Sequence, residues 1–424
     1  MTRIPLGRAH VLAQQISREF RRCSSSDDLT PVGGIRRFAP DVGQVSLLAI
    51  VSRARRPEVL KMLATLPSVS AMAAPDINRV ALTTVRGPVT VHIASRQHAG
   101  SALAWHTGSR QHVDQLIRIA RDRDLRFESG MLYRHGTPVT LPTESDFYHA
   151  LDLPLIPPEL RHGEDELDAA REGRLPELIS DGHIRGDLHM HTIWSDGRDS
   201  VEDMVGAARQ LGYEYVAITD HSERALSARK LARDEIARQQ ADIQAVRERV
   251  RDIDVLHGVE VDIMQDGSLD FDDETLATFD IVLASLHDHG GQDRQRLTAR
   301  YLSAINHPLV NVITHPANRS PAFSPGYDID FDALFAAAAT SGTALEVDGA
   351  PGHLDLDGAL ARRAVGAGVT LTIDSDCHRA EWMRRQMRFG VGTARRGWVG
   401  PGHVLNTRSV TAVRAFVAAK RARA

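Results

Sequence analysis

Residues 184–197 read IRGDLHMHTIWSDG, and this stretch decides the fold of the second half of the chain. A short predicted strand at 184–188 leads directly into His189 and His191, and Asp196 follows five residues later. Side chains two positions apart on a strand face the same side, so both imidazoles can bind one ion. The stretch therefore predicts a strand that ends in metal ligands.

Short apolar runs, rich in β-branched residues, recur after this stretch. They lie at 215–219, 255–261, 281–285, 310–314, 344–347 and 369–373. Segments with helical spacing of apolar residues separate them, at 201–211, 233–251, 294–305, 331–340 and 356–367. Strands that alternate with helices predict βα units and a parallel sheet. Seven such strands can close into a barrel or lie open in a doubly wound sheet.

Residues that can bind metals follow most of these predicted strands. The candidates are His189, His191, Asp196, His221, Glu260, His287, His315, Asp376 and His378. The carboxyl ends of successive parallel strands meet at one mouth of a barrel, whereas an open sheet would spread them along an edge. The repeated arrangement therefore favours a barrel.

The types of these side chains indicate which ions they suit. Imidazoles and carboxylates without thiolates favour zinc, manganese or iron. Six histidines and three carboxylates exceed what one tetrahedral ion can use, so we expect two or three divalent ions. Clusters of this kind activate water and stabilise the oxygens of a phosphoester during in-line attack. An ordinary core or surface position is the alternative for any single histidine.

The composition is that of a globular protein with two or three domains. The chain has 424 residues, of which 42% are hydrophobic and 25% charged. Its two cysteines, Cys23 and Cys377, exclude a disulfide framework and a thiolate zinc site. The first twenty residues lack the apolar run of a signal peptide, and no run of ~18 apolar residues follows. We expect a cytoplasmic enzyme without a membrane partner.

Charge divides the chain into two parts. Residues 1–160 hold 20 basic and 14 acidic side chains, whereas residues 161–424 hold 31 basic and 41 acidic ones. The basic part suits phosphate contacts, although an ordinary solvated surface explains this modest excess equally well. The acidic part suits bound cations. In the basic part, 45–51 and 89–94 are predicted strands, and 111–123 is a predicted helix preceded by Ser109.

Six motifs resemble those of the polymerase and histidinol phosphatase (PHP) domain. They are GDLHMHTIWSDG (186–197), AITDHS (217–222), GVEVDI (258–263), LASLH (283–287), ITHP (313–316) and DSDCH (374–378). The resemblance spans about residues 183–410 and implies a phosphoesterase with a distorted (β/α)7 barrel and a trinuclear metal centre.

The PHP resemblance also assigns the candidate ligands to three ions. The first would be held by His189, His191, Glu260 and Asp376. Glu260 would bridge to a second ion, which would be shared with His287 and His315. The third would be held by Asp196, His221 and His378. Each of the nine positions carries a competent ligand, so this resemblance implies an active hydrolase.

Segments outside the barrel are similar to bacterial family X DNA polymerases. They are RIPLGRA (3–9), VGGIRRF (32–38), SALAWHTGSRQH (101–112), TESDFYHALDLPLIPPELR (143–161) and ARRGWVGPGHVLNT (394–407). This similarity implies a palm and thumb of the polymerase beta type, an α+β module, before the PHP barrel. The predicted domains are a degenerate nucleotidyltransferase palm at 1–95, a thumb at 96–160, a linker at 161–182 and the barrel at 183–424. We expect the family's N-terminal helix-hairpin-helix domain to be absent.

The palm departs from the family at its metal ligands. Family polymerases bind two magnesium ions with three aspartates, and Gln44, Ser46 and Thr90 stand at those positions here. An amide and two hydroxyls do not replace three carboxylates for a hard dication. Residues 42–50 contain no acidic residue, so a shift in alignment does not restore one. We therefore expect no DNA polymerase activity from a module that retains DNA binding. Arg36, Arg37 and Arg110 are either phosphate contacts or plain surface charges.

The resemblance implies a metal-dependent phosphoesterase that acts on DNA 3′ ends, as a 3′-5′ exonuclease or end-processing enzyme in DNA repair. Arg319 is the main candidate for a phosphate contact, and Lys230 and Arg224 are weaker ones. Asp348 replaces a usual asparagine and His353 a usual arginine, which puts the substrate contacts in doubt but not the metals.

Two other functions stay open at the level of the sequence. One is a phosphatase of a small phosphomonoester, similar to histidinol phosphatase, because the same metal centre serves both reactions. The other is a non-catalytic DNA-repair scaffold, which the complete ligand set disfavours. No protein partner is indicated.

Overall fold

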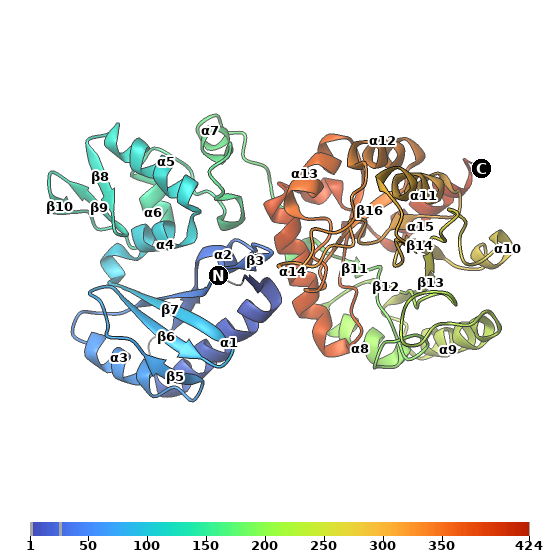
Figure 1. The fold of residues 1–424 in the computed structure, drawn as a ribbon, viewed down its shortest axis with the longest axis horizontal. Helices are drawn as coiled ribbons and strands as arrows, with labels where there is room; N and C mark the ends of the chain where they lie inside the picture. Colours follow the sequence, from blue (N-terminus) through green and yellow to red (C-terminus); the bar gives the residue numbers. More distant parts are fainter. Residues whose placement is uncertain (1–2, 25–27, 424) are drawn as a thin grey trace. The chain divides into compact units, whose positions relative to one another are not determined.

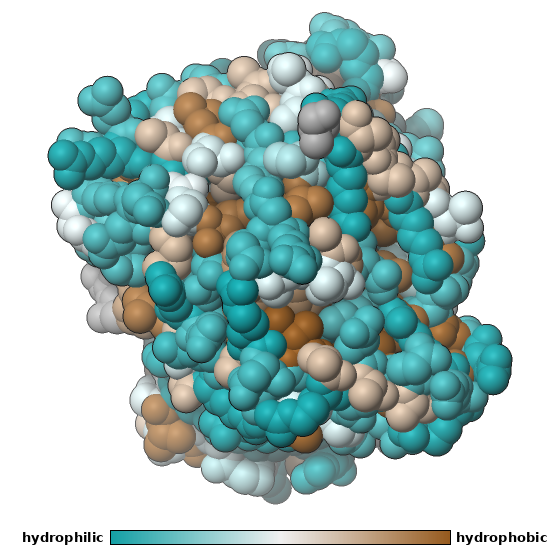
Figure 2. All heavy atoms as spheres, turned by 90° about the vertical axis from the view of Figure 1, so that its right-hand side faces the viewer, coloured by the Kyte–Doolittle hydropathy of each residue, from teal (hydrophilic) through white to brown (hydrophobic). Residues whose placement is uncertain are grey.

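The computed structural model describes residues 3–24 and 28–423, and the chain divides into two compact units, Met1–Leu175 and Pro176–Ala424. None of the helices in these described ranges is long and apolar enough to cross a membrane. Figure 2 shows one face of the molecule, on which hydrophilic residues cover most of the surface and hydrophobic ones appear between them.

The first unit begins with a mixed five-stranded sheet. In spatial order its strands are β2 (Leu29–Pro31), β4 (Val45–Ile50), β7 (Gly87–Ala94), β6 (Arg79–Thr84) and β5 (Val69–Met72). The helices of this part are α1 (Leu6–Cys23), α2 (Gly33–Arg36) and α3 (Arg56–Ala64), and β1 (Ile4–Pro5) pairs with β3 (Asp41–Val42). Strands β4 and β7 are parallel, and their register places Ser46 opposite Thr90.

Three helices and a small antiparallel sheet continue the first unit. The helices are α4 (Ala99–Thr107), α5 (Arg110–Arg121) and α6 (Glu144–His149), and the strands are β8 (Leu125–Glu128), β9 (Met131–Arg134) and β10 (Thr137–Pro138). Ser109 caps α5 by accepting a hydrogen bond from the backbone N–H of His112, as the sequence predicted. Within the segment predicted as a linker lies α7 (Glu166–Arg171), and Glu166 contacts the buried His112 ring at 2.6 Å. Through this contact, α7 packs against α5 of the first unit.

Seven parallel strands form the second unit in sequence order. They are β11 (Gly186–Asp187), β12 (Tyr215–Ile218), β13 (Asp254–Asp262), β14 (Ile281–Ser285), β15 (Val312–Ile313), β16 (Ala344–Asp348) and β17 (Leu371–Asp374). The strands are buried along nearly their whole length, as expected for a parallel sheet covered by helices.

Helices surround these strands (Figure 1). They are α8 (Val201–Leu211), α9 (Ile236–Arg249), α10 (Asp273–Leu276), α11 (Arg294–Asn306), α12 (Phe331–Ser341), α13 (Gly358–Gly366), α14 (Met383–Arg396) and α15 (Val410–Arg421). The predicted α/β class, with a (β/α)7 barrel after an α+β module, is confirmed.

Side chains join the two edge strands of the barrel, β11 and β17. The backbone N–H of Leu188 donates to Asp374 Oδ1 at 2.8 Å, and that of Ser375 donates to Asp187 Oδ1 at 3.1 Å. The backbone N–H of His191 donates to the carbonyl of Cys377 at 3.0 Å. The barrel is thus nearly closed, and the residues that follow β11 and β17 lie side by side at its mouth.

Candidate metal centre

Four of the predicted ligands meet between β11, β13 and β17. His191 Nε2 lies 3.1 Å from Asp376 Oδ1 and 3.6 Å from Glu260 Oε2. His189 Nε2 lies 3.7 Å from Asp376 Oδ1 and 3.5 Å from Glu260 Oε2. His189, His191 and Glu260 are completely buried and Asp376 is 7% exposed. The structure brings together all four residues expected for the first ion.

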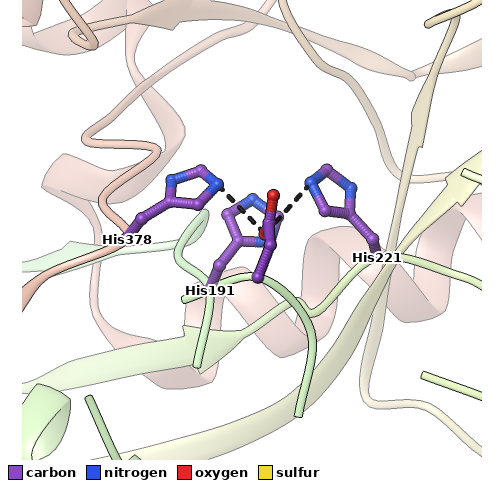
Figure 3. A group of neighbouring side chains, drawn as sticks. His191, His221 and His378 are labelled. Atoms are coloured by element: carbon purple, nitrogen blue, oxygen red, sulfur yellow. Dashed lines mark ion pairs between the residues drawn. The ribbon is translucent and has the colours of Figure 1, made fainter. Parts of the chain in front are cut away.

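A second group lies on the other side of His191. Asp196 Oδ1 is 3.2 Å from His378 Nε2 and 3.6 Å from His221 Nε2. Together with His191 these residues offer ligand atoms within 4.8 Å of one another. Figure 3 shows the imidazoles of His191, His221 and His378 turned toward one another. The three residues expected for the third ion are therefore neighbours, with His191 beside them.

Glu260 lies at the centre of the remaining ligands. His315 Nε2 is 3.0 Å and His287 Nε2 is 3.8 Å from its Oε1 atom, while His221 Nδ1 is 2.7 Å from its Oε2 atom. His221, Glu260 and His287 offer atoms within 4.8 Å of one another. The carboxylate of Glu260 thus faces ligands of every group, as expected of a bridging residue.

Unpaired buried atoms show that the site fits cations. Within the described part of the chain, Glu260 Oε2, Asp196 Oδ1 and His221 Nδ1 are buried without a hydrogen bond, although the Glu260 and His221 atoms lie only 2.7 Å apart. Burial of charged or polar atoms without partners costs free energy, which a bound cation offsets. Imidazole and carboxylate donors in this number suit divalent transition metals.

Carboxylates behind the ligands hold their rings in place. Glu346 Oε1 on β16 lies 2.7 Å from His189 Nδ1, and Asp262 Oδ1 on β13 lies 2.5 Å from His287 Nδ1. Such partners fix the ring orientation and leave the other ring nitrogen for a metal. The sequence analysis missed both residues. The available signal was an acidic residue within the buried predicted strand 344–347, for Glu346, and directly after the buried predicted strand 255–261, for Asp262.

Charge in the centre changes the pKa of several ligands. Burial and the neighbouring rings of His221 and His378 lower the pKa of His191 to about 3. Burial also opposes the charged form of His378, but Asp196 and Asp376 outweigh it and raise its pKa to about 9. His287 behaves like His378, because Glu260 and Asp262 raise its pKa to about 9 against the effect of burial. A cation that binds at neutral pH therefore displaces protons from His287 and His378.

Comparison with known proteins gives the family. Residues 102–162 match the DNA polymerase beta thumb, and residues 187–318 match the PHP domain. The DNA polymerase/3′-5′ exonuclease PolX of Bacillus subtilis is 34% identical over 420 residues, which are 98% of this chain and 73% of that protein. The chain belongs to the PolX family.

The barrel alone is also similar to shorter relatives. A probable phosphatase of Thermoanaerobacter sp. (strain X514) is 30% identical over 203 residues, 45% of this chain and 78% of the relative. A probable phosphatase of Shewanella oneidensis is 30% identical over 202 residues, 45% of this chain and 75% of the relative. A PHP domain with PolX and phosphatase relatives makes this member of the PolX family a hydrolase.

The three predicted substrate contacts, Arg319, Arg224 and Lys230, have different surroundings. Arg319 Nη1 lies 2.7 Å from Asp357 Oδ2, and the side chain is 13% exposed. Arg224 is 69% exposed and its Nε lies 3.5 Å from Asp270. Lys230 lies at the end of a loop that returns to the metal centre, because the N–H of Leu231 donates to the carbonyl of His221 at 2.8 Å. All three lie near candidate ligands: Arg224 is three residues after His221, Arg319 is four residues after His315, and the loop that ends at Lys230 returns to His221.

The three positions predicted to have lost polymerase metal ligands also have defined neighbours. Gln44 is exposed just before β4, and Ser46 lies opposite Thr90 in the β4–β7 register. Neither strand contains an acidic residue. Arg36 Nη1 donates to Thr107 Oγ1 at 2.8 Å and to Glu144 Oε1 at 2.9 Å. Arg37 donates to the carbonyl of Thr107, whereas Arg110 is 95% exposed. Arg36 and Arg37 thus connect the α2 region to Thr107 at the end of α4, and Arg36 also contacts Glu144 on α6.

Proposed function

We propose that the chain is a metal-dependent phosphoesterase that removes nucleotides from DNA 3′ ends in the 3′-5′ direction. The convergence of nine imidazoles and carboxylates on one barrel mouth, in a member of the PolX family, is the observation that supports it most. We assign two to three divalent ions of manganese, zinc or iron to this mouth.

The roles of the side chains follow from their positions. When bound, the ions would supply an activated water and neutralise charge on the phosphate oxygens. The first ion belongs to His189, His191, Glu260 and Asp376, the second to Glu260, His287 and His315, and the third to Asp196, His221 and His378. Glu346 and Asp262 orient two of the rings. We assign the contact with the phosphate backbone of DNA to Arg319, which also pairs with Asp357, and keep Lys230 and Arg224 as weaker candidates.

We also propose that the first unit has no polymerase activity and serves to bind DNA. Its segments are a palm at 1–95 and a thumb at 96–160, and residues 161–175 pack with them. Gln44, Ser46 and Thr90 offer no carboxylate to a magnesium ion. The nearest acidic residue in sequence, Asp41, accepts a hydrogen bond from Arg3 Nε at 2.7 Å. One engaged carboxylate does not replace three ligands.

A second candidate function is the hydrolysis of small phosphomonoesters. The similarity of the barrel to probable phosphatases favours it. The DNA polymerase beta thumb at 102–162 disfavours it, because a small substrate needs no DNA-binding unit. A non-catalytic scaffold is the third candidate, and the complete ligand set disfavours it.

One substrate panel separates these functions. The purified chain, loaded with Mn²⁺, is given a 3′-recessed duplex, a single-stranded oligonucleotide and a small phosphomonoester such as a nucleotide. We expect nucleotide release from the DNA substrates. Hydrolysis of the monoester alone would identify a phosphatase, and DNA binding without any hydrolysis would identify a scaffold. His191→Ala serves as the inactive control.

A further inference from the structure

A fourth group of possible ligands lies at the barrel mouth, beside the groups assigned above. Asp348, His353 and Asp376 offer one ligand atom each, and these atoms lie within 4.8 Å of one another. Asp348 ends β16, His353 lies in the loop that follows, and Asp376 follows β17. Only Asp376 belongs to the ions already assigned. We propose that this chain holds an additional divalent cation between Asp348, His353 and Asp376.

The carboxylate of Asp348 supports the proposal because only one of its two oxygen atoms has a hydrogen-bond partner among the described residues. The side chain is completely buried, and its Oδ1 atom accepts a hydrogen bond from the backbone N–H of Ala350 at 2.5 Å. Its Oδ2 atom has no hydrogen bond to any residue that the structure describes. The neighbouring carboxylate of Asp376 is 7% exposed. Two facing buried carboxylates require a cation or a shared proton between them.

His353 completes the group with a ring that is held in place. It stacks on His315, with ring centroids 5.0 Å apart and planes inclined by 21°. The Nδ1 atom of His353 is buried and has no hydrogen-bond partner in residues 3–24 and 28–423. An imidazole beside two carboxylates suits manganese, zinc or iron. The ring is therefore positioned as a ligand rather than bound to another side chain.

The backbone between Asp348 and His353 is packed tightly, which fixes the spacing of the two ligands. A Cβ atom at Gly349 would lie 2.1 Å from the carbonyl oxygen of Gln386 on α14, so only glycine fits there. The backbone N–H of His353 donates to the carbonyl of Ala350 at 2.9 Å, which closes the turn. A site on such a turn loses little conformational freedom when an ion binds.

The proposal rests on the proposed metal centre, because Asp376 would bridge the new ion to the one held by His189 and His191. The ion would add positive charge at the β16 side of the mouth. The alternative is a protonated Asp348 that donates to Asp376, with His353 only packed against His315. The two arrangements differ in the number of ions bound.

Metal content tests the proposal without an activity assay. The full chain is saturated with Mn²⁺, freed of loose metal by gel filtration, and analysed for manganese per chain. Asp348→Asn and His353→Gln should each bind one ion fewer than the unsubstituted chain. Asp252→Asn, at an exposed carboxylate paired with Arg209, is the matched control and should bind the full number.

Equal manganese content in the unsubstituted chain and in Asp348→Asn would overturn the additional site and leave the proposed function intact. A chain that binds no manganese at all would overturn both. If neither variant folds, anomalous diffraction from Mn²⁺-soaked crystals of the unsubstituted chain decides. A peak about 2.0–2.2 Å from Asp348 Oδ2 supports the site, and the absence of density there overturns it.

Discussion

The Nδ1 atom of His189 lies 2.7 Å from Oε1 of Glu346, and both side chains are completely buried. Glu346 Oε2 also accepts a hydrogen bond from the backbone N–H of His315 at 2.8 Å. One carboxylate on β16 therefore holds two candidate ligands that follow different strands. Glu346 lies behind the ligands, so we describe it as a positioning residue. Substituting it tests directly whether the ligand rings must be held in place.

We expect Glu346→Gln to weaken metal binding by about 10- to 100-fold, because a neutral amide orients the His189 ring less firmly and reduces its basicity. The affinity is measured by competition with a chromophoric chelator. Glu214→Gln, at a half-exposed carboxylate paired with Arg185, is the control and should bind as the unsubstituted chain does. An unchanged affinity in Glu346→Gln would show that the contact does not orient the ligand.

The first unit should incorporate no nucleotide into a primed template with Mg²⁺, because β4 and β7 offer hydroxyls where carboxylates are needed. The triple variant Gln44→Asp, Ser46→Asp, Thr90→Asp should gain a Mg²⁺ site, since Ser46 and Thr90 lie opposite each other. Primer extension measures the activity, and isothermal titration measures Mg²⁺ binding. Primer extension by the unsubstituted chain would disprove the loss of polymerase activity.

Acid should destabilise the first unit through two stacked rings, those of His92 and His106, whose centroids are 3.8 Å apart. Burial lowers the pKa of His92 to about 4 and that of His106 to about 3, whereas both titrate near pH 6.5 in an unfolded chain. Below about pH 6.5 the unfolded chain binds more protons than the folded chain does. The stability that depends on keeping these two rings neutral is therefore complete above that pH and is lost as the pH falls toward 4.

We expect each of these two histidines to cost about 1–2 kcal/mol of unfolding free energy by pH 5. Chemical denaturation at pH 7.5 and pH 5 measures the effect, and His106→Phe keeps an aromatic ring without the titrating group. The variant should lose less stability than the unsubstituted chain over this interval. Equal losses in the two proteins would show that the stacked rings do not carry the effect.

Much of the barrel follows from local patterns in the sequence. The predicted strand 281–285 coincides with β14, and the predicted strand 255–261 lies within β13. The ligands were found because they lie at or just after the ends of strands, and parallel strands bring those ends together without further information. The predicted strand 310–314 shortens to the two residues of β15.

Other features depend on contacts between residues far apart in the sequence. Arg319 pairs with Asp357, 38 residues away, and its predicted contact with phosphate stays a prediction. Glu346 orients a histidine 157 positions earlier; an acidic residue in a buried strand marks it as unusual, but the local sequence does not show which side chain it contacts. The position of α7 also depends on a distant contact. Its Glu166 contacts His112, so this part of the predicted linker belongs to the first unit.

The most direct test of the central claim is nucleotide release from a 3′-recessed duplex, labelled on either end, by the metal-loaded chain and by Asp376→Ala. The account predicts stepwise shortening from the 3′ end that requires added divalent metal and falls more than about 100-fold in Asp376→Ala. Release that persists unchanged in Asp376→Ala, or no release with manganese, zinc or iron, would contradict it.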